Sequence, residues 1–297
     1  MIELQNISKS FDGVSVLDNI STGIPDSGIF AICGASGSGK TTLMRIILGL
    51  EQPDSGNISG LEVKKTAVVF QNDRLLPWLS ALDNVAAVCS KERAKEMLEK
   101  VELSDALNKK PAELSGGMCR RVALARALAF DADILLLDEP FSALDSYLKW
   151  NLEIELADLL ATFNGPILWV SHDRDECYRN CRSVCVMENG RTGEVTPMDE
   201  MIRHPGSISA ARLAGCKNFF AAEAKDGKVY LPEWNVALPL VVTEKPFTTL
   251  GILDNAVTLS ESGGMSCTVC RMIPGVEENI LLLCPEGSAE GAPMLRI

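Results

Sequence analysis

Residues 33–42 read CGASGSGKTT, and residues 34–41 match the pattern G-x-x-x-x-G-K-[ST] at every fixed position. The apolar run before them, residues 28–33, predicts a buried strand, and residues 41–49 predict a helix. In this context the loop amides curve around phosphate groups, and the helix N-terminus adds positive potential. A chance glycine-rich turn is the weaker interpretation, because the whole pattern and its context agree. The predicted phosphate ligands are Gly34, Ala35, Ser36, Gly37, Ser38, Gly39, Lys40, Thr41 and Thr42.

Acidic residues follow a second apolar run. Residues 134–137 read ILLL, and the absence of polar alternation is typical of a parallel-sheet strand covered on both faces. In phosphoryl transfer, Lys40 is placed to reach the β- and γ-phosphates, while Thr41 and Asp138 are placed to hold Mg²⁺. Glu139 can orient and deprotonate an attacking water. A purely structural role for the two adjacent carboxylates is weak, because burying charge without a partner is costly.

A histidine follows the next predicted strand, residues 166–170. His172 therefore falls at the carboxyl edge of the sheet, where ligands bind in doubly wound folds. A lone histidine is more often structural, but this position favours contact with a γ-phosphate.

The composition limits the classes of partner. The 297 residues carry a formal net charge of −12, which argues against binding nucleic acid or anionic lipid through a basic patch. The first residues lack the features of a signal peptide, and no apolar run approaches the roughly 18 residues that span a bilayer. The ten cysteines are interpreted as small buried hydrophobes of a reducing compartment. Cys267 and Cys270 form a C-x-x-C without the second pair that a structural zinc site needs.

The periodicity divides the chain into two parts, residues 1–205 and 215–297. In the first part, apolar strands alternate with helices, which predicts an α/β fold with a parallel sheet. Residues 75–128 have a helical period, and residues 185–191 predict two edge strands joined by an Asn-Gly turn. Only short strands separated by turn residues remain in the second part, which predicts a small, barrel-like all-β module.

A second glycine-rich motif opens a helix far from the phosphate loop. Residues 114–118 read LSGGM, and none of them is a nucleophile, a metal ligand or a general base. Together with the phosphate loop, the two carboxylates and His172, this motif resembles the signature of the ATP-binding cassette (ABC) family over residues 1 to about 205. The resemblance implies an ABC ATPase fold, which has a RecA-like core, an antiparallel β subdomain and a helical subdomain, here at about residues 75–128.

The signature motif has a distinct role in that family. Two subunits meet head to tail, and the residues corresponding to Ser115, Gly116 and Gly117 form an anion cradle for the ATP of the partner subunit. The fifth position of the motif is usually glutamine. Met118 stands there in this chain, as is common in importer cassettes of the nitrate, sulfonate and taurine group.

The resemblance also implies roles for residues outside these motifs. Gln71 resembles the Q-loop glutamine, which contacts Mg²⁺, and residues 142–145 resemble the D-loop at the dimer seam. Phe11 and Val16 stand where the family contacts the adenine ring, although Phe11 alone fits an ordinary core position equally well. Residues 75–79, LLPWL, occupy the neighbourhood that receives the membrane subunit. Trp78 is expected to face that partner, while Leu76 and Leu79 are expected to pack under the helical subdomain.

The resemblance implies an ATP-hydrolysing subunit of an importer, with ATP and Mg²⁺ as ligands. As a homodimer it would energise separate integral membrane permease subunits, served indirectly by an extracytoplasmic solute-binding protein, without a nucleic-acid partner. The expected location is the cytoplasmic face of the cell membrane, held there by the permease. A small-molecule kinase would not need residues 114–118, and exporters of this size often lack a C-terminal β module. A soluble ABC ATPase with a non-transport role remains the alternative.

The cargo is the least determined property. The cassette resembles the nitrate, sulfonate and taurine group, and residues 213–218 and 250–253 weakly resemble the accessory β domain of molybdate importers. A small oxyanion is therefore expected, and an unrelated small solute is the alternative. The tail itself is expected to stabilise a dimer or to be purely structural rather than to bind oxyanion.

Overall fold

Six strands form the central sheet of the protein. The structure, a computed structural model, describes residues 1–61, 64–142, 146–239, 247–253, 256–258, 260, 264–274 and 279–297, without the side chains of 146–148 and 151. The chain divides into two units, Met1–Arg203 and His204–Ile297, and each is described by itself.

Five strands of the central sheet are parallel, and the sixth, β9, pairs antiparallel with β8. Apolar, unalternating runs form the middle strands, and every residue of β6 and β7 is buried, as expected of a sheet covered on both faces. The prediction of two edge strands was wrong for β8, because β8 lies between β3 and β9. In sheet order the strands are β5 (Thr66–Val69), β6 (Ile134–Asp138), β7 (Pro166–Ser171), β3 (Gly28–Cys33), β8 (Ser183–Glu188) and β9 (Arg191–Pro197).

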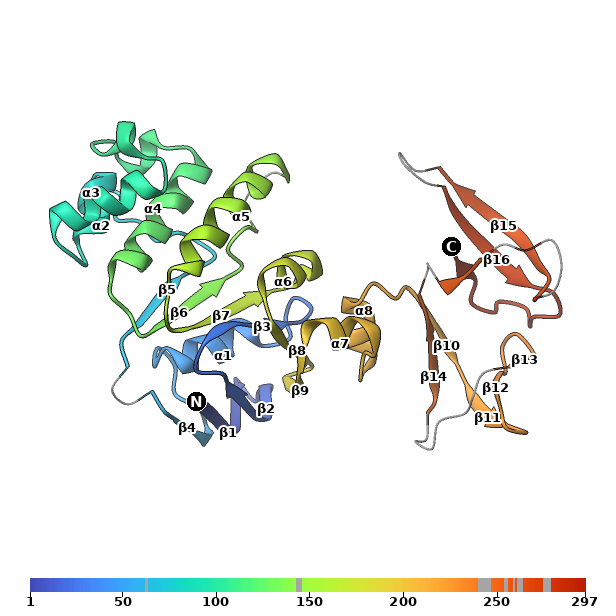
Figure 1. Ribbon diagram of the computed structural model, residues 1–297. Coiled ribbons are helices and arrows are strands. Elements are labelled where there is room, and N and C mark those ends of the chain that lie inside the picture. The colour runs from blue at the N-terminus through green and yellow to red at the C-terminus, as the bar shows by residue number, and fades with distance from the viewer. Residues whose placement is uncertain are drawn as a thin grey trace. The chain divides into compact units, whose positions relative to one another are not determined.

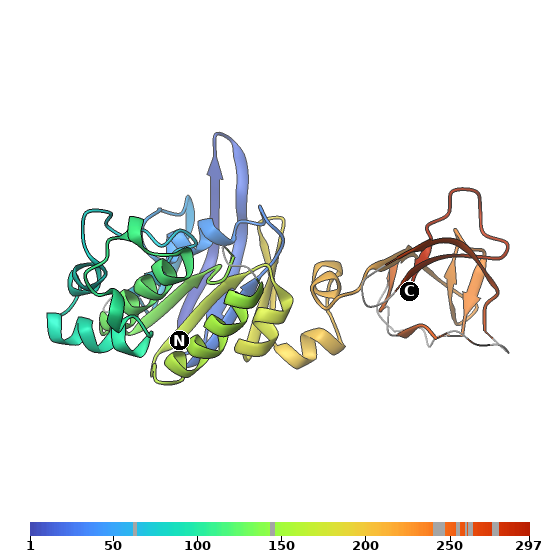
Figure 2. The ribbon, with the colours of Figure 1, turned by 90° about the horizontal axis from the view of Figure 1, so that it is seen from above.

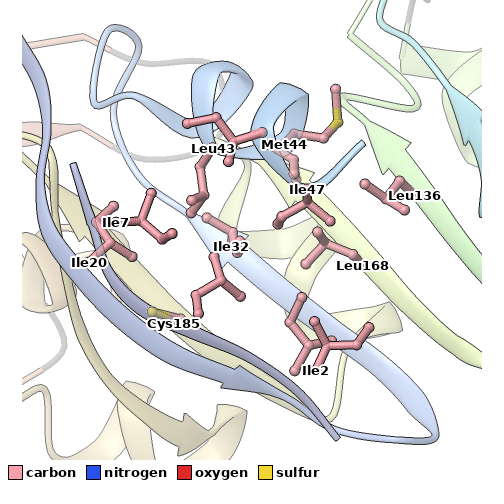
Figure 3. Close-up of a cluster of buried hydrophobic side chains, with 14 of the residues drawn as sticks. Ile2, Ile7, Ile20, Ile32, Leu43, Met44, Ile47, Leu136, Leu168 and Cys185 are labelled. Atoms are coloured by element: carbon pink, nitrogen blue, oxygen red, sulfur yellow. The ribbon is translucent and has the colours of Figure 1, made fainter. Parts of the chain in front are cut away.

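A second, antiparallel sheet has the order β2–β1–β4. Its long hairpin extends beyond the rest of its unit (Figure 2). Bulges interrupt its register, and the alternate buried residues face α1 (Lys40–Ile47) and the central sheet. Figure 3 shows Ile7 and Ile20 of this sheet beside Ile32 of β3 and Leu43 of α1. The strands are β1 (Ile2–Phe11), β2 (Val14–Ile24) and β4 (Ser55–Ser59).

Three helices form a separate cluster with its own apolar core (Figure 1). They are α2 (Ala81–Ala86), α3 (Lys91–Lys100) and α4 (Gly116–Ala129), and the short 3₁₀ turns η1 (Ser104–Ala106) and η2 (Pro111–Glu113) lead into α4. Each helix begins after a serine whose hydroxyl accepts a hydrogen bond from the first turn. The capping serines are Ser80, Ser90 and Ser115.

The remaining helices of the first unit are α5 (Ser146–Ala161), α6 (Arg174–Asn180) and α7 (Met198–Arg203). α5 and α6 precede and follow β7 in the chain, and α6 packs against β3 and β7. α6 is therefore in contact with β3, the strand that leads into the phosphate loop.

The second unit is a short helix followed by small sheets, and the tilted rings of Trp234 and Phe220 pack together in its core at 4.1 Å between centroids. The Trp234 Nε1–H donates a hydrogen bond to the Pro293 carbonyl, which satisfies the buried indole. The helix is α8 (Ile208–Leu213). The strands are β10 (Asn218–Ala221), β11 (Glu223–Lys225), β12 (Lys228–Leu231), β13 (Val236–Leu238), β14 (Thr249–Ile252), β15 (Cys267–Ile273), β16 (Ile280–Pro285) and β17 (Leu295–Arg296).

Candidate functional site

The phosphate loop turns between β3 and α1 in a conformation that demands glycine at two places. A Cβ on Gly34 would lie 2.2 Å from the Met187 carbonyl oxygen, and Gly39 has a φ of +101°. A residue with a side chain would be strained at the φ of Gly39, and a Cβ at position 34 would clash with the Met187 carbonyl. The local backbone thus explains both fixed glycines of the motif without reference to a ligand.

Lys40 spans the loop from the first turn of α1. Its Nζ donates hydrogen bonds to the carbonyls of Gly34, at 2.8 Å, and Ala35, at 2.9 Å. Burial lowers the pKa of Lys40, and the negative charge of Glu139 opposes that shift. The ammonium is therefore held over the loop by neutral acceptors, which an anionic oxygen can replace with a stronger, charge-assisted bond.

Four parallel strands end at one edge of the sheet and bring the predicted residues together. β3 leads into the phosphate loop, β6 into Glu139, β7 into His172 and β5 toward Gln71. A pocket of about 440 Å³ opens at this edge. Its lining comprises Val16, Ser36, Gly37, Gly39, Lys40, Thr41, Thr42, Gln71, Glu139 and His172.

Glu139 and His172 both line this pocket and contact each other. The His172 Nδ1 lies 2.6 Å from Glu139 Oε2, and the Glu139 backbone N–H donates to the Val170 carbonyl at 2.8 Å. Glu139 has a φ of +49°, a left-handed conformation that is uncommon for glutamate and that recurs at functional sites. The turn directs this carboxylate into the pocket, where only 13% of its side chain remains exposed.

Asp138 provides the best evidence for a cation. It is 4% exposed, and its Oδ1 atom is buried without a hydrogen-bond partner. Burial raises the pKa of Asp138, and the neighbouring Glu139 raises it further. A hard divalent cation such as Mg²⁺ prefers carboxylate, amide and hydroxyl oxygens, which Asp138, Gln71 and Thr41 supply around adjoining pockets. The residues present therefore fit Mg²⁺.

The raised pKa of Asp138 leads to a stability prediction. Ionising this carboxyl costs more in the folded protein than in the unfolded chain, so the cost is present at neutral pH and disappears toward pH 3.8, where both states bind the proton. Asp138→Asn is expected to raise the Tm of the nucleotide-free protein by a few degrees at pH 7, a gain that shrinks as the pH falls. Calorimetry measures the Tm, and Asp158→Asn is the control because Asp158 is an exposed residue of α5. A lower Tm for Asp138→Asn without nucleotide would contradict the interpretation.

Phe11 and Val16 differ in their relation to the pocket. Val16 lines it, whereas Phe11 is not among the lining residues and is 43% exposed beside Lys9, whose Nζ is 5.2 Å from the ring centroid. The structure thus excludes the core position that the sequence left open for Phe11. Of the suggested D-loop, residues 143–145 lie outside the described residues.

The signature motif caps α4 and does not line the pocket. The Ser115 Oγ accepts a hydrogen bond from the Met118 backbone N–H at 3.2 Å, which leaves the hydroxyl hydrogen free to donate to another acceptor. A Cβ on Gly116 or Gly117 would meet no atom within 4 Å, so packing within the described part of this chain does not require either glycine. The space beside both glycines is therefore open to a group from outside this part of the chain.

Arg120 connects the signature helix α4 to the segments around Gln71 and Glu139, and the sequence analysis did not identify this residue. It lies on the buried face of α4 with 4% exposure, and its guanidinium donates to Asp73 Oδ1 at 2.9 Å. The remaining donors reach backbone carbonyls of the segment after β5 and of the segment after β6. These acceptors are Phe70, Asp138, Glu139 and Pro140. The helix that carries the signature is therefore fastened to the segments that carry Gln71 and Glu139.

Removing this guanidinium is expected to be strongly destabilising. Arg120→Gln leaves several buried carbonyls and the Asp73 carboxylate without a donor, which corresponds to a loss of about 3–5 kcal/mol in the free energy of unfolding. Urea unfolding measures that loss. Arg93→Gln on α3 is the control, because the Arg93 pair with Glu96 is exposed and is worth about 1 kcal/mol or less. Equal losses for the two variants would contradict the role given to Arg120.

The segment after Gln71 presents an apolar side chain to solvent. Trp78 is 66% exposed, while Leu76 is half-buried and bonded through its backbone to the side chain of Asn84. Asn84 is fully buried and also donates to the carbonyls of Leu79 and Ser80. The fold thus holds this loop rigidly with Trp78 outward.

Among the described residues, no helix is both long and apolar enough to cross a membrane. No group of three or more His, Cys, Asp or Glu side chains in that part of the chain is arranged to hold a metal ion.

Comparisons with known proteins agree with this geometry. A family model described as ABC transporter matches residues 17–142. The Fe(3+) ions import ATP-binding protein of Photorhabdus laumondii is 32% identical over 91% of this chain and 83% of its own length. The sulfate/thiosulfate import ATP-binding protein of Yersinia pseudotuberculosis is 35% identical, over 77% of this chain and 69% of its own. The spermidine/putrescine import ATP-binding protein of Marinobacter nauticus is 36% identical, over 74% and 64%.

A solved structure confirms the predicted fold class. It is a dimeric ATP-binding cassette in a post-hydrolysis state bound to ADP and Pi, and it aligns with a TM-score of 0.60 and 29% identity. The alignment covers 67% of this chain and 99% of that one. The chain belongs to the ABC transporter family, as an ATP-binding ATPase of importer type.

Proposed function

We propose that this chain hydrolyses ATP to drive a separate membrane permease that imports a small solute. The gathering of Lys40, Gln71, Glu139 and His172 around one pocket, beside the unpartnered oxygen of Asp138, carries this proposal. Positioning and charge stabilisation dominate phosphoryl transfer, and this pocket supplies both.

The residues divide the chemistry among them. The loop amides and Lys40 bind the β- and γ-phosphates. Thr41, Gln71 and Asp138 would hold Mg²⁺, which would supply positive charge against the phosphate oxygens. Glu139 accepts a proton from the attacking water and directs that water in line with the leaving group. His172, 2.6 Å from Glu139, keeps that carboxylate oriented and donates toward the γ-phosphate.

A second copy of the chain completes each site. Ser115, Gly116 and Gly117 are absent from the pocket lining, and no described side chain fills the space beside the two glycines. The dimeric cassettes among the solved relatives support a pair in which one copy supplies Lys40 and the other supplies Ser115. ATP then favours the closed pair, and hydrolysis releases it.

The permease is a separate protein in this proposal. The chain has no membrane-spanning helix among its described residues, and the loop after Gln71 exposes Trp78 on its surface. We place the permease contact on this surface, which holds the chain at the cytoplasmic face of the membrane. An extracytoplasmic solute-binding protein would deliver the cargo to the permease.

The two structural units suggest two domains. We propose an ATPase domain over residues 1–205, with a helical subdomain at about 75–128, and an accessory β domain over 215–297. The unit boundary at Arg203 and His204 and the separate apolar core around Trp234 support this division.

The cargo we propose is a small oxyanion of the nitrate, sulfonate or molybdate kind. The sulfate/thiosulfate importers among the relatives support an oxyanion, while the iron and polyamine importers provide the competing classes. Because this chain does not touch the cargo in the proposal, the solute-binding protein has to be assayed.

Purification of the tagged chain from its own membranes tests the proposal. We expect a permease to co-purify, and ATP hydrolysis to rise when the loaded solute-binding protein is added to the complex in vesicles. Isothermal titration of that binding protein with molybdate, nitrate, sulfonates, ferric ion and spermidine then identifies the cargo. Recovery of RNA and no permease would favour the non-transport alternative.

A further inference from the structure

Three cysteines meet behind the phosphate loop. Cys33 is the last residue of β3 and directly precedes Gly34, Cys177 lies in α6, and Cys181 ends that helix. The sulfurs of Cys33 and Cys177 are 2.6 Å apart, and both residues are 0% exposed. Cys181 is 6% exposed and hydrogen-bonds to Cys177. The hydrolysis chemistry uses none of the three thiols.

The pKa values of the three clustered cysteines shift in different directions. Hydrogen bonds from the thiols of Cys181 and Cys33 hold the pKa of Cys177 well below its ordinary value. The bond to Cys177, together with burial, raises the pKa of Cys33, and burial raises that of Cys181. These shifts favour a Cys177 thiolate between two thiol donors, and a thiolate is the form of cysteine that reacts with oxidants.

We propose that Cys33 and Cys177 form a redox-active pair that a small peroxide converts into a disulfide beneath the phosphate loop. Their sulfurs are only about 0.6 Å farther apart than in a disulfide bond. Simple burial of small apolar side chains, which the sequence suggested for these cysteines, does not bring two sulfurs into hydrogen-bonding contact. In a reducing compartment such a bond forms transiently and reports oxidation.

The oxidation proceeds in two steps. The Cys177 thiolate attacks one peroxide oxygen, the O–O bond breaks, and a sulfenic acid and hydroxide form. The Cys33 sulfur then attacks the sulfenic sulfur, the S–O bond breaks, and the departing oxygen leaves as water with the Cys33 proton. The two cysteines lose two electrons together, and the peroxide is reduced to water and hydroxide.

The disulfide would join two segments of the ATP site. Cys33 leads into the phosphate loop, and α6 begins after Asp173, the residue next to His172. Because the Gly34 backbone already packs closely against the Met187 carbonyl, a displacement of Cys33 would also displace the phosphate loop. A misplacement of about 1 Å can cost about 100-fold in rate, so oxidation is expected to lower hydrolysis by about tenfold or more. This consequence rests on the proposed function, whereas the disulfide itself does not.

Peptide mapping of the full-length protein tests the pair directly. The folded protein is treated with hydrogen peroxide, alkylated, digested and analysed by mass spectrometry. We expect a Cys33 peptide linked to a Cys177 peptide, which dithiothreitol separates. Oxidised glutathione should react much more slowly, because the buried thiolate admits only a small, uncharged oxidant. Alkylation of Cys33 and Cys177 after peroxide treatment, or linkage of either to another cysteine, would overturn the proposal.

Cysteine variants distinguish formation of the Cys33–Cys177 disulfide from non-specific oxidation of other cysteines. Cys177→Ala should leave Cys33 reduced, and Cys181→Ala should slow formation of the bond because the thiolate loses a donor. Cys119→Ala, which removes a half-buried cysteine of α4, should change neither result. If Cys177→Ala does not fold, the mapping of the natural chain decides alone. Hydrolysis that stays unchanged while the disulfide is present would overturn the effect on the ATP site but not the proposed ATPase.

Discussion

Glu139→Gln is expected to lower ATP hydrolysis by about 10²–10⁴-fold, because glutamine cannot accept the proton of the attacking water. ATP binding should remain, since Lys40, the loop amides and Asp138 are untouched. Because hydrolysis no longer opens the pair, the variant should accumulate as a dimer with ATP and Mg²⁺. Phosphate release and size-exclusion chromatography with light scattering measure the two effects.

A matched variant separates this effect from the loss of a charge. Glu194 lies on β9, is exposed, and Glu194→Gln changes the net charge by the same amount. It should hydrolyse ATP at the natural rate and return to the monomer as ATP is consumed. A Glu139→Gln protein that keeps most of its activity would exclude Glu139 as the base.

Gly117→Asp is expected to abolish hydrolysis almost as completely while each copy still binds ATP. The new carboxylate enters the anion cradle proposed for the partner's γ-phosphate, where like charges repel in a site that excludes water. Removing a single oxyanion donor costs about 10²–10³-fold, and adding a negative charge should cost at least as much. Nucleotide affinity is measured with a fluorescent ATP analogue and turnover by phosphate release.

The structure makes this variant informative, because it should fold normally. A Cβ on Gly117 meets nothing within 4 Å, and the same is true of Gly206, which supplies the control. Gly206→Asp should leave turnover unchanged. Gly117→Ala should have a smaller effect than Gly117→Asp. A Gly117→Asp protein with near-normal turnover would mean that no phosphate approaches this helix.

The fixed residues of the nucleotide motifs could be placed from the sequence, because backbone conformation dictates them. Gly34 and Gly39 are required by local geometry, and the two carboxylates at the end of β6 follow an apolar run too short to be anything but a strand. The parallel pairing of β3, β6 and β7 then brings separate motifs to one edge.

Long-range contacts could not be predicted in the same way. Arg120 is spaced with buried Leu124 and Ala127 on α4, a pattern that could have marked it as a buried arginine. Its acceptors are backbone carbonyls, which leave no signal in the sequence. β8 was assigned to an edge because its pairing with β3 depends on residues far away in the chain.

The thiol cluster shows the same limit. Cys177 and Cys181 are four residues apart, so their contact across one helical turn can be anticipated. Cys33 is far from both in sequence, and only the packing of α6 against β3 brings its sulfur to Cys177. Burial was predicted for Cys33, but its partner could not be.

The sharing of each ATP between two copies of this chain is tested most directly by crosslinking. One tagged copy carries Ser36→Cys and a differently tagged copy carries Ser115→Cys, both with Glu139→Gln, and the mixture is treated with a short bis-maleimide. A mixture without the two added cysteines controls for the native thiols. The account predicts a covalent product bearing both tags that forms only with ATP and Mg²⁺. The absence of a doubly tagged product with ATP and Mg²⁺, together with a link inside a separate double variant that carries both Ser36→Cys and Ser115→Cys on one chain, would contradict it.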